Sequence, residues 1–330
     1  MSRKIAWVVA VSGLLVLAAA AACGAVNAVL GHRPMPALVG NRPDLQASKS
    51  KYRVAVLGDS QKGIANLRNV LRAVKAEDVD FILQTGDLVS TNDEGHYRLA
   101  ALTLERAELP VRMAIVPGNH DLKEGPERFE RECGSLEFRF RRGSVVFVVI
   151  NNAFGPPPFL ERLDEMLKGL QADDAVVLAM HVPPFDAEGA VQPGYEPFLA
   201  WLEKSRVKYL LCGHVHGYFK KQVGGATVLV NGVGGDYDKW QLDQKVYATI
   251  LEVDGTTITD RAIELPPEHA LRENIEHLAI GHVAEAYRRR PAGCWGATVL
   301  IAMLVGISIG VLRRPRPYGK IDAERAAPAP

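Results

Sequence analysis

The sequence has little cysteine, no excess of one charge and no internal repeat. Only four of its 330 residues are Cys, so a disulfide-stapled scaffold is excluded. The 39 Lys and Arg nearly balance 38 Asp and Glu, and the net charge of +1 provides no general attraction to polyanions. The 30 Gly and 20 Pro show no collagen-like period. With 48% hydrophobic and 23% charged residues, the chain is expected to fold rather than stay disordered.

Charged side chains are missing altogether from two long stretches, residues 5–30 and 292–312. At a rise of about 1.5 Å per residue, each stretch can cross a hydrocarbon core about 30 Å thick. Both are therefore predicted to be transmembrane helices, which makes the membrane a predicted partner. Basic residues suggest the orientation, since Arg3 and Lys4 precede the first stretch and Arg313 follows the second. The positive-inside rule then predicts a two-pass cell-membrane protein with an extracytoplasmic central region, although arginines before the second stretch partly oppose it.

The first apolar stretch has a second interpretation. A short basic start followed by the alanine-rich residues 18–22 is also typical of a signal peptide with a small-residue cleavage site. Acylation of Cys23 is a weaker alternative, because the five residues directly before it, 18–22, are all alanine. The sequence leaves open whether this segment is removed.

Strand-like and helix-like patterns alternate between the two apolar stretches. Apolar or β-branched runs predict strands at residues 52–57, 81–84, 111–116, 136–142, 144–150, 175–180, 207–211, 226–230, 247–253 and 256–260. Apolar residues at helical spacing predict helices near residues 64–74, 96–107 and 160–170. Early βαβ alternation followed by strand-rich sequence predicts mixed sheets with helices outside them.

The predicted domain organisation has six parts. They are an N-terminal membrane segment (1–30), a Pro-containing linker (31–50), a central domain (51–263), a juxtamembrane helix (264–291), a C-terminal membrane segment (292–312) and a basic, Pro/Ala-rich tail (313–330).

Side chains with metal affinity follow five of the predicted strands, each at the carboxyl end. In chain order they are Asp59 and Gln61, then Asp87, then Asn119, His120 and Asp121, then His181, and finally His214 and His216. Ligands of open α/β sheets collect beyond the carboxyl ends of the strands. Each turn alone has an ordinary structural explanation. Five successive turns that all present Asp, Asn or His indicate a metal site.

The donor set narrows the choice of metal. Two carboxylates, one or two amides and three imidazoles suit Mn, Fe or Zn better than Ca or Mg alone. The donors are too many for one tetrahedral ion, and they suit two ions about 3.5–4 Å apart that share a carboxylate. Such a pair activates a water and holds the oxygens of a phosphoryl group during in-line attack. The sequence therefore predicts two divalent metal ions.

The order Gly-Asp-x-x, Gly-Asp, Gly-Asn-His-Asp, His and Gly-His-x-His resembles the calcineurin-like metallophosphoesterases. The resemblance extends from Lys51 to about Asp260, and the membrane segments make the chain similar to a membrane-anchored, bacterial-type member. It implies an α/β fold of two packed mixed β-sheets flanked by helices, a four-layer α-β-β-α sandwich. Here that domain is expected to carry N- and C-terminal transmembrane helices.

The resemblance also implies a role for each matched residue. Asp87 is expected to bridge both ions. Asp59 and His216 match ligands of the first ion, and the second ion is expected to bind Asn119, His181 and His214. His120 is expected to contact the phosphate and protonate the leaving oxygen, with Asn119 helping to stabilise the extra charge and Asp121 orienting the His120 ring.

One position departs from the family pattern. The first motif usually reads Asp-x-His, and here it reads Asp59-Ser60-Gln61. Gln61 either binds a metal through its amide oxygen, which is a weaker donor than imidazole, or only hydrogen-bonds a metal-bound water. The substitution therefore supports an alternative function, a catalytically weak or inactive metal- or phosphate-binding membrane protein.

The main prediction is a metal-dependent phosphoesterase that acts at a membrane on a phosphate ester or a pyrophosphate. Its substrate is expected to be a phosphorylated compound, either lipid-linked or a small molecule. A nuclease is disfavoured because the charge is balanced and no basic groove pattern is present. No nucleic-acid or protein partner is predicted.

Overall fold

The computed structural model describes residues 3–30, 35, 49–61, 63–109, 111–156, 160–232, 245–268, 275 and 277–313. The chain divides into a sheet unit, Leu30–His282, and a helical unit made of Met1–Val29 and Val283–Pro330. The predicted linker 31–50 lies outside the described residues except for positions 35, 49 and 50, and the predicted tail does so except for position 313.

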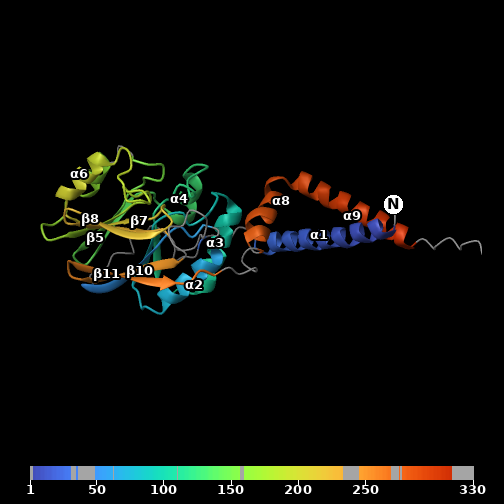
Figure 1. The fold of residues 1–330 in the computed structure, drawn as a ribbon, viewed down its shortest axis with the longest axis horizontal. Helices are drawn as coiled ribbons and strands as arrows, with labels where there is room; N and C mark the ends of the chain where they lie inside the picture. Colours follow the sequence, from blue (N-terminus) through green and yellow to red (C-terminus); the bar gives the residue numbers. More distant parts are fainter. Residues whose placement is uncertain are drawn as a thin grey trace, which may run out of the picture. The chain divides into compact units, whose positions relative to one another are not determined.

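Two mixed sheets form the sheet unit (Figure 1). The first has the order β11-β10-β1-β2-β3, with β1 Lys51–Leu57, β2 Phe81–Gln84, β3 Arg112–Ile115, β10 Val246–Asp254 and β11 Thr257–Leu265. The second has the order β4-β5-β6-β7-β9-β8, with β4 Phe138–Arg142, β5 Val145–Val149, β6 Ala175–Ala179, β7 Val207–Cys212, β8 Tyr218–Val223 and β9 Ala226–Asn231.

Parallel pairing aligns the carboxyl ends of the central strands. In the first sheet β1, β2 and β3 run parallel, and Leu57, Gln84 and Ile115 stand in register. In the second sheet β5, β6 and β7 run parallel, with Val149 opposite Ala179. The turns that follow these strands therefore begin at a common edge of each sheet, where ligand-binding side chains gather.

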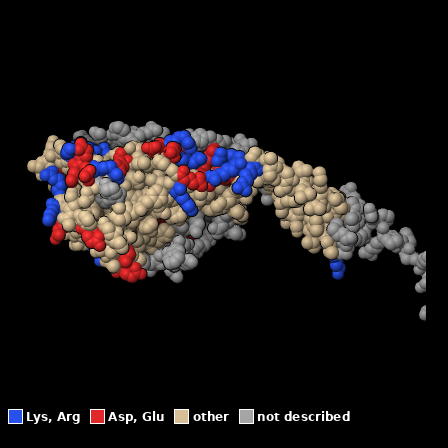
Figure 2. Space-filling model, turned by 90° about the horizontal axis from the view of Figure 1, so that it is seen from above, with Lys and Arg blue, Asp and Glu red and all other residues tan. Residues whose placement is uncertain are grey.

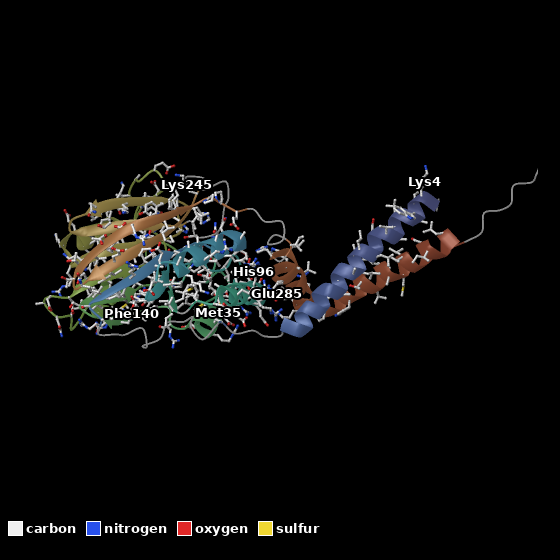
Figure 3. The ribbon with its side chains drawn as sticks, turned by 90° about the horizontal axis from the view of Figure 1, so that it is seen from below. Lys4, Met35, His96, Phe140, Lys245 and Glu285 are labelled. Carbon is white, nitrogen blue, oxygen red and sulfur yellow. The ribbon has the colours of Figure 1, made fainter. Side chains whose placement is uncertain are left out.

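Three apolar layers join the sheets and helices. Between the two sheets, the ring of Phe81 in β2 packs edge-on against those of Phe140 in β4 and Phe147 in β5, with centroids 5.5 and 5.1 Å apart (Figure 3 labels Phe140). A second layer packs the first sheet against α2 (Ile64–Lys75), α3 (Glu94–Ala107) and α4 (Glu127–Cys133). A third packs the second sheet against α5 (Leu160–Met166) and α6 (Glu196–Lys204). The predicted arrangement of two mixed sheets between helices is therefore present.

The structure also contains elements that the sequence patterns did not reveal. β8 is an edge strand whose side chains are half-buried or exposed, and it carries Lys220 and Lys221 rather than an apolar run. Lysines on an edge strand discourage further strand pairing, and they also hide the strand from a search for apolar runs. α4 and α6 have only seven and nine residues, too few to show a clear helical period.

The predicted juxtamembrane helix, residues 264–291, differs from the structure. Its first residues complete β11, which continues to Leu265, and positions 269–274 and 276 lie outside the described residues. The remainder is a π-helix, η2 (His277–Ala284), followed by a short α8 (Glu285–Arg289). α8 ends at Arg289, two residues before Pro291.

The helical unit contains α1 (Arg3–Leu30) and α9 (Pro291–Arg313). In the described part of the chain, one helix is long and apolar enough to cross a membrane, over Pro291–Ile309 with a mean hydropathy of 2.0. α1 contributes a shorter apolar stretch, Lys4–Ala18. The structure thus supports one of the two predicted spans by length and composition.

Candidate metal centre

Four residues of the site have a strained backbone. Asp59, Gln61, Asp87 and His214 have φ angles of 53°, 38°, 55° and 66°. A left-handed conformation is unfavourable for a residue with a Cβ, and such strain concentrates at functional sites. In the described residues only two other non-glycine positions share it. The left-handed residues in the turns after β1, β2 and β7 are therefore associated with the positioning of these side chains at the candidate metal centre.

Glycines allow the chain to approach the carboxylates closely. A Cβ on Gly118 would lie 2.2 Å from both the backbone N and the Oδ1 of Asp87. A Cβ on Gly213 would lie 2.5 Å from Asp59 Oδ2. These contacts are far shorter than van der Waals distances, so the Gly residues that precede Asn119 and His214 are sterically required.

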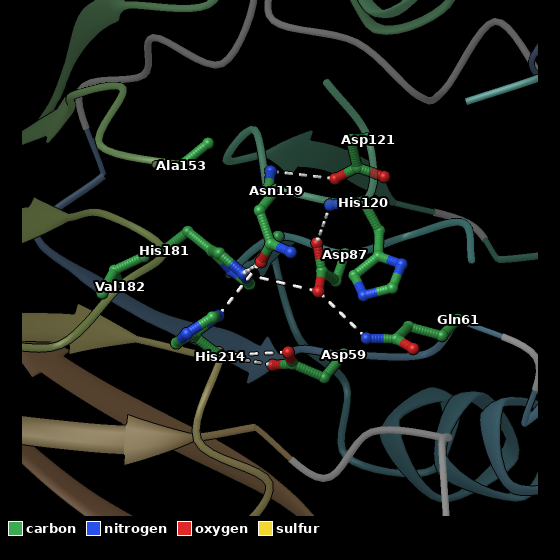
Figure 4. Close-up of polar contacts among 12 residues, drawn as sticks. Asp59, Gln61, Asp87, Asn119, His120, Asp121, Ala153, His181, Val182 and His214 are labelled. Carbon is green, nitrogen blue, oxygen red and sulfur yellow. Dashed lines mark hydrogen bonds and ion pairs between the residues drawn. The ribbon is translucent and has the colours of Figure 1, made fainter. Parts of the chain in front are cut away.

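The two aspartates lie at the centre of the cluster (Figure 4). Asp87 accepts hydrogen bonds from Gln61 Nε2 at 2.9 Å and from the backbone N of His120 at 2.8 Å, and its Oδ2 lies 3.5 Å from His181 Nε2. Asp59 accepts from the backbone N of His214 at 3.0 Å, and its Oδ1 lies 3.6 Å from the Nε2 of His216. The ligand atoms of Asp59, Asp87 and His181 all lie within 4.8 Å of one another.

Asn119 joins two histidines in a second group of donors. Its Oδ1 lies 3.0 Å from His181 Nε2 and 3.0 Å from His214 Nδ1. The Nδ1 of His181 donates to the carbonyl of Thr85 at 2.9 Å, so its Nε2 is the nitrogen that faces the cluster. A backbone carbonyl commonly fixes the ring of a metal-binding histidine in this way.

Charges inside the cluster shift the pKa values of its members. Burial raises the pKa of Asp87, but the charge and hydrogen bond of His181, then the contacts with His120, outweigh it and lower the pKa to about 2. Burial lowers the pKa of His181, but Asp87 and Asp59 outweigh it and raise the pKa to about 9. Burial raises the pKa of Asp59 well above its usual range, against the charge of His181. Burial and the charge of His181 lower the pKa of His214 to about 4, which favours its neutral form.

These residues fit divalent metal ions. The buried carboxylates of Asp59 and Asp87 face the imidazole of His181, and a divalent cation bound between these groups would supply the positive charge that buried carboxylates require. The seven predicted ligands, Asp59, Gln61, Asp87, Asn119, His181, His214 and His216, are all linked by the contacts above. Their mixture of carboxylate, amide and imidazole suits Mn, Fe or Zn.

The orientation of His120 differs from the expectation. Its Nδ1 donates to the backbone carbonyl of Ser90 at 2.8 Å. Asp121 is fully buried and its carboxylate accepts from the backbone N of Gly118, Leu88 and Val89 at 3.0, 3.3 and 3.1 Å. Asp121 therefore acts on His120 indirectly, because it holds the 88–89 backbone that leads to the Ser90 carbonyl. Burial and the charge of Asp87 raise the pKa of Asp121 to about 7.

Gln61 presents its amide nitrogen to the site. Its Nε2 donates to Asp87 and lies 3.5 Å from His216 Nε2. In this orientation the Gln61 amide acts as a hydrogen-bond donor to Asp87.

Asn152 is a supporting residue that the sequence did not reveal. Its Oδ1 accepts from the backbone N of His181 at 2.8 Å and of Val182 at 3.1 Å, and its Nδ2 donates to the carbonyl of Val182. It follows β5 as the metal donors follow their strands, so its position was the available signal. Gln84 likewise hydrogen-bonds both the backbone N and O of Gly86 and shapes the turn before Asp87.

Comparison with known proteins identifies the family. A model of the calcineurin-like phosphoesterases matches residues 52–218, and the chain belongs to this family. No curated protein matches the chain. Membership supports assignment as a metal-binding hydrolase of phosphate esters.

Several solved structures are similar to this chain at low sequence identity. The purple acid phosphatase PPD1 from yellow lupin (Lupinus luteus) seeds is 15% identical with a TM-score of 0.51, over 68% of this chain and 55% of that chain. A putative 5′-nucleotidase from Staphylococcus aureus is 16% identical with a TM-score of 0.46, over 72% and 58%. GAP50 of Plasmodium is 14% identical with a TM-score of 0.46, over 71% and 96%. The chain thus spans about half the length of the lupin phosphatase chain.

Proposed function

We propose that this chain is a membrane-anchored phosphoesterase with two divalent metal ions, acting on a phosphate ester or a pyrophosphate. The observation that carries the proposal is the pair of donor groups described above. One is formed by Asp59 and His216 and the other by Asn119, His181 and His214. The carboxylate of Asp87 contacts Gln61 beside the first group and His181 in the second, as expected of a bridging ligand.

His120 and Asn119 have different roles in the proposed hydrolysis. When bound, two divalent ions supply a water of lowered pKa and positive charge for the phosphoryl oxygens. His120, with its Nδ1–H donating to the Ser90 carbonyl, directs its Nε2 away from that carbonyl. As an imidazolium it can give its Nε2 proton to the leaving oxygen and return to the neutral ring, which keeps the proton on Nδ1. Asn119 contacts His181 and His214 through its Oδ1. Its amide group is thereby placed to help stabilise the negative charge of a phosphate bound at the centre.

A hydrolysis screen with metal analysis tests the proposal. The full chain in detergent is assayed with chromogenic phosphate monoesters and diesters, and with phospholipid, nucleotide and sugar-phosphate panels, in the presence of Mn²⁺ or Zn²⁺. Hydrolysis with about two Mn²⁺ ions per chain is the expected result. Metal binding without hydrolysis under every condition would favour the alternative, a catalytically inactive metal- or phosphate-binding membrane protein.

Replacing Gln61 with His is expected to strengthen metal binding at the first group. Imidazole is a better donor to transition metals than an amide, and histidine tolerates the left-handed backbone of this position. The Mn²⁺ concentration for half-maximal hydrolysis is expected to fall by about 10-fold. Gln222→His, on the edge strand β8, controls for adventitious binding by an added histidine. An unchanged or raised Mn²⁺ requirement in Gln61→His would contradict this role.

A two-pass topology with an extracytoplasmic sheet unit is part of the proposal. Ala6 and Ala10 of α1 are buried, and a Cβ on Gly13 would lie 2.2 Å from Val305 Cγ2 of α9. Small residues at such a contact are typical of packed transmembrane helices. A membrane location of both helices would bring lipid-linked substrates within reach, while small phosphorylated molecules remain alternatives. On the face shown in Figure 2, acidic and basic side chains are intermixed over the sheet unit.

Replacing Gly13 with Leu is expected to separate α1 from α9. The added side chain has no room beside Val305, so the full chain in detergent should lose helix pairing and unfold at a lower temperature. Gly306→Leu in α9 is the matched control, because a Cβ there meets no atom within 4 Å. Equal thermal unfolding temperatures for the two variants would contradict the packing of α1 on α9.

A further inference from the structure

A second group of potential metal ligands lies apart from the aspartates and histidines of the metal centre. It consists of His96 in α3 and His277 and His282 in η2, all within the sheet unit. Their ligand nitrogens lie within 4.8 Å of one another, and the three pairs of ring centroids are 4.9–5.2 Å apart. The proposed phosphoesterase reaction uses none of these residues.

The ring of His96 is held as a metal ligand would be. It is 4% exposed and its Nδ1 donates to Asp93 Oδ1 at 2.8 Å, which leaves the Nε2 lone pair available (Figure 3 labels His96). Within the described residues this buried Nε2 has no hydrogen-bond partner. A carboxylate that orients the ring from its far nitrogen is the usual outer contact of a metal-binding histidine.

The π-helix brings the other two rings to the same place. His277 and His282 are five residues apart. In an α-helix, with about 100° per residue, they would point about 140° apart. The i→i+5 pattern of a π-helix instead places residues five apart on one face, and such segments occur frequently at functional sites. Gly281 lets η2 approach closely, because a Cβ there would lie 3.1 Å from His96 Nε2.

We propose that His96, His277 and His282 form a mononuclear site for a transition-metal ion, with Zn²⁺ as the best fit. Three imidazoles with a fourth position open to water are an established zinc geometry, and imidazole also suits Cu and Ni. His282 is exposed and gives the ion a path from solvent. The ion ties η2, which leads in sequence toward the apolar helix α9, to the body of the sheet unit through α3.

The surroundings of His282 act in the direction that metal binding requires. Burial and the neighbouring His96 lower the pKa of His282, while Asp93 opposes the shift. The neutral imidazole that binds metal is thereby favoured near neutral pH.

Zinc titration of the full chain in detergent tests the site, with binding measured by elemental analysis after gel filtration. The wild type is expected to retain one more equivalent of Zn²⁺ than His282→Ala. Leu278→Ala is the matched control, since Leu278 is an exposed neighbour on η2 and should retain the full amount. Equal zinc content in wild type and His282→Ala, or an equal loss in Leu278→Ala, would overturn the proposal.

Two further variants separate this site from the metal centre and from simple unfolding. Asp87→Asn should still retain the additional equivalent of Zn²⁺, since Asp87 is not part of the histidine cluster. Loss of that equivalent in Asp87→Asn would place the ion at the metal centre and overturn the proposal. Asp93→Asn keeps a side-chain oxygen for the backbone N of His96, which caps α3, but removes the carboxylate. Its zinc affinity is expected to fall about 10- to 100-fold, and an unchanged affinity would exclude the proposed orientation of His96.

Discussion

Replacing Asp87 with Asn is expected to abolish phosphate-ester hydrolysis, with turnover falling by about 10³-fold or more. The substitution removes the negative charge that the proposal shares between two ions. It also places an amide nitrogen within the contacts that Gln61 Nε2 and His181 Nε2 make with the carboxylate. A pKa of about 2 keeps Asp87 ionised at neutral pH, so this charge is present in the wild type under assay conditions.

The fold is expected to survive this change. Asn tolerates the left-handed backbone at position 87, and its Oδ1 can still accept from the backbone N of His120. Asp78→Asn is a matched control, because Asp78 is exposed and also has a positive φ of 51°, yet lies outside the metal centre. Metal content and turnover of both variants are measured on the folded chain. Wild-type turnover in Asp87→Asn would refute the bridging role and the mechanism with it.

The sequence indicated that these donors lie close together because each of them follows a strand. Apolar runs mark the strands, and Gly residues such as Gly118 and Gly213 mark the turns, so Asp87, Asn119 and His214 could each be placed at the carboxyl end of a strand. Parallel pairing in register within the first sheet brings the turns of Asp87 and Asn119 together, whereas His214 follows β7 of the second sheet.

Interactions through the backbone were beyond the reach of sequence patterns. The carbonyl of Ser90, which fixes the ring of His120, has no residue-type signature, since every residue carries a carbonyl. The family resemblance placed Asp121 in that role, whereas the structure uses Asp121 to hold the preceding backbone.

The histidine cluster shows a second limit of prediction from sequence patterns. His96 sits on a helix whose apolar pattern predicts only packing, and His277 and His282 are misaligned on an α-helix. Only the π-helical winding and the tertiary contact of η2 with α3 bring the three rings together. A search for close-spaced ligand motifs therefore does not find this site.

Replacing His120 with Ala is expected to slow hydrolysis in a way that depends on the leaving group. If Nε2 of His120 protonates the leaving oxygen, an alkyl phosphate with a poor leaving group should lose about 10²- to 10⁴-fold in kcat. A nitrophenyl ester, whose oxygen leaves without a proton, should lose much less. The ratio of the two losses therefore reports proton donation rather than a general disturbance of the site.

Metal content provides the control for this prediction. The ring of His120 hydrogen-bonds to the carbonyl of Ser90. The contact of His120 with Asp87 is made by the backbone N of His120, which alanine retains. The His120→Ala variant should therefore bind the same number of ions as the wild type. Equal losses with both leaving groups would exclude His120 as the proton donor, and a loss of metal would instead place its ring among the ligands.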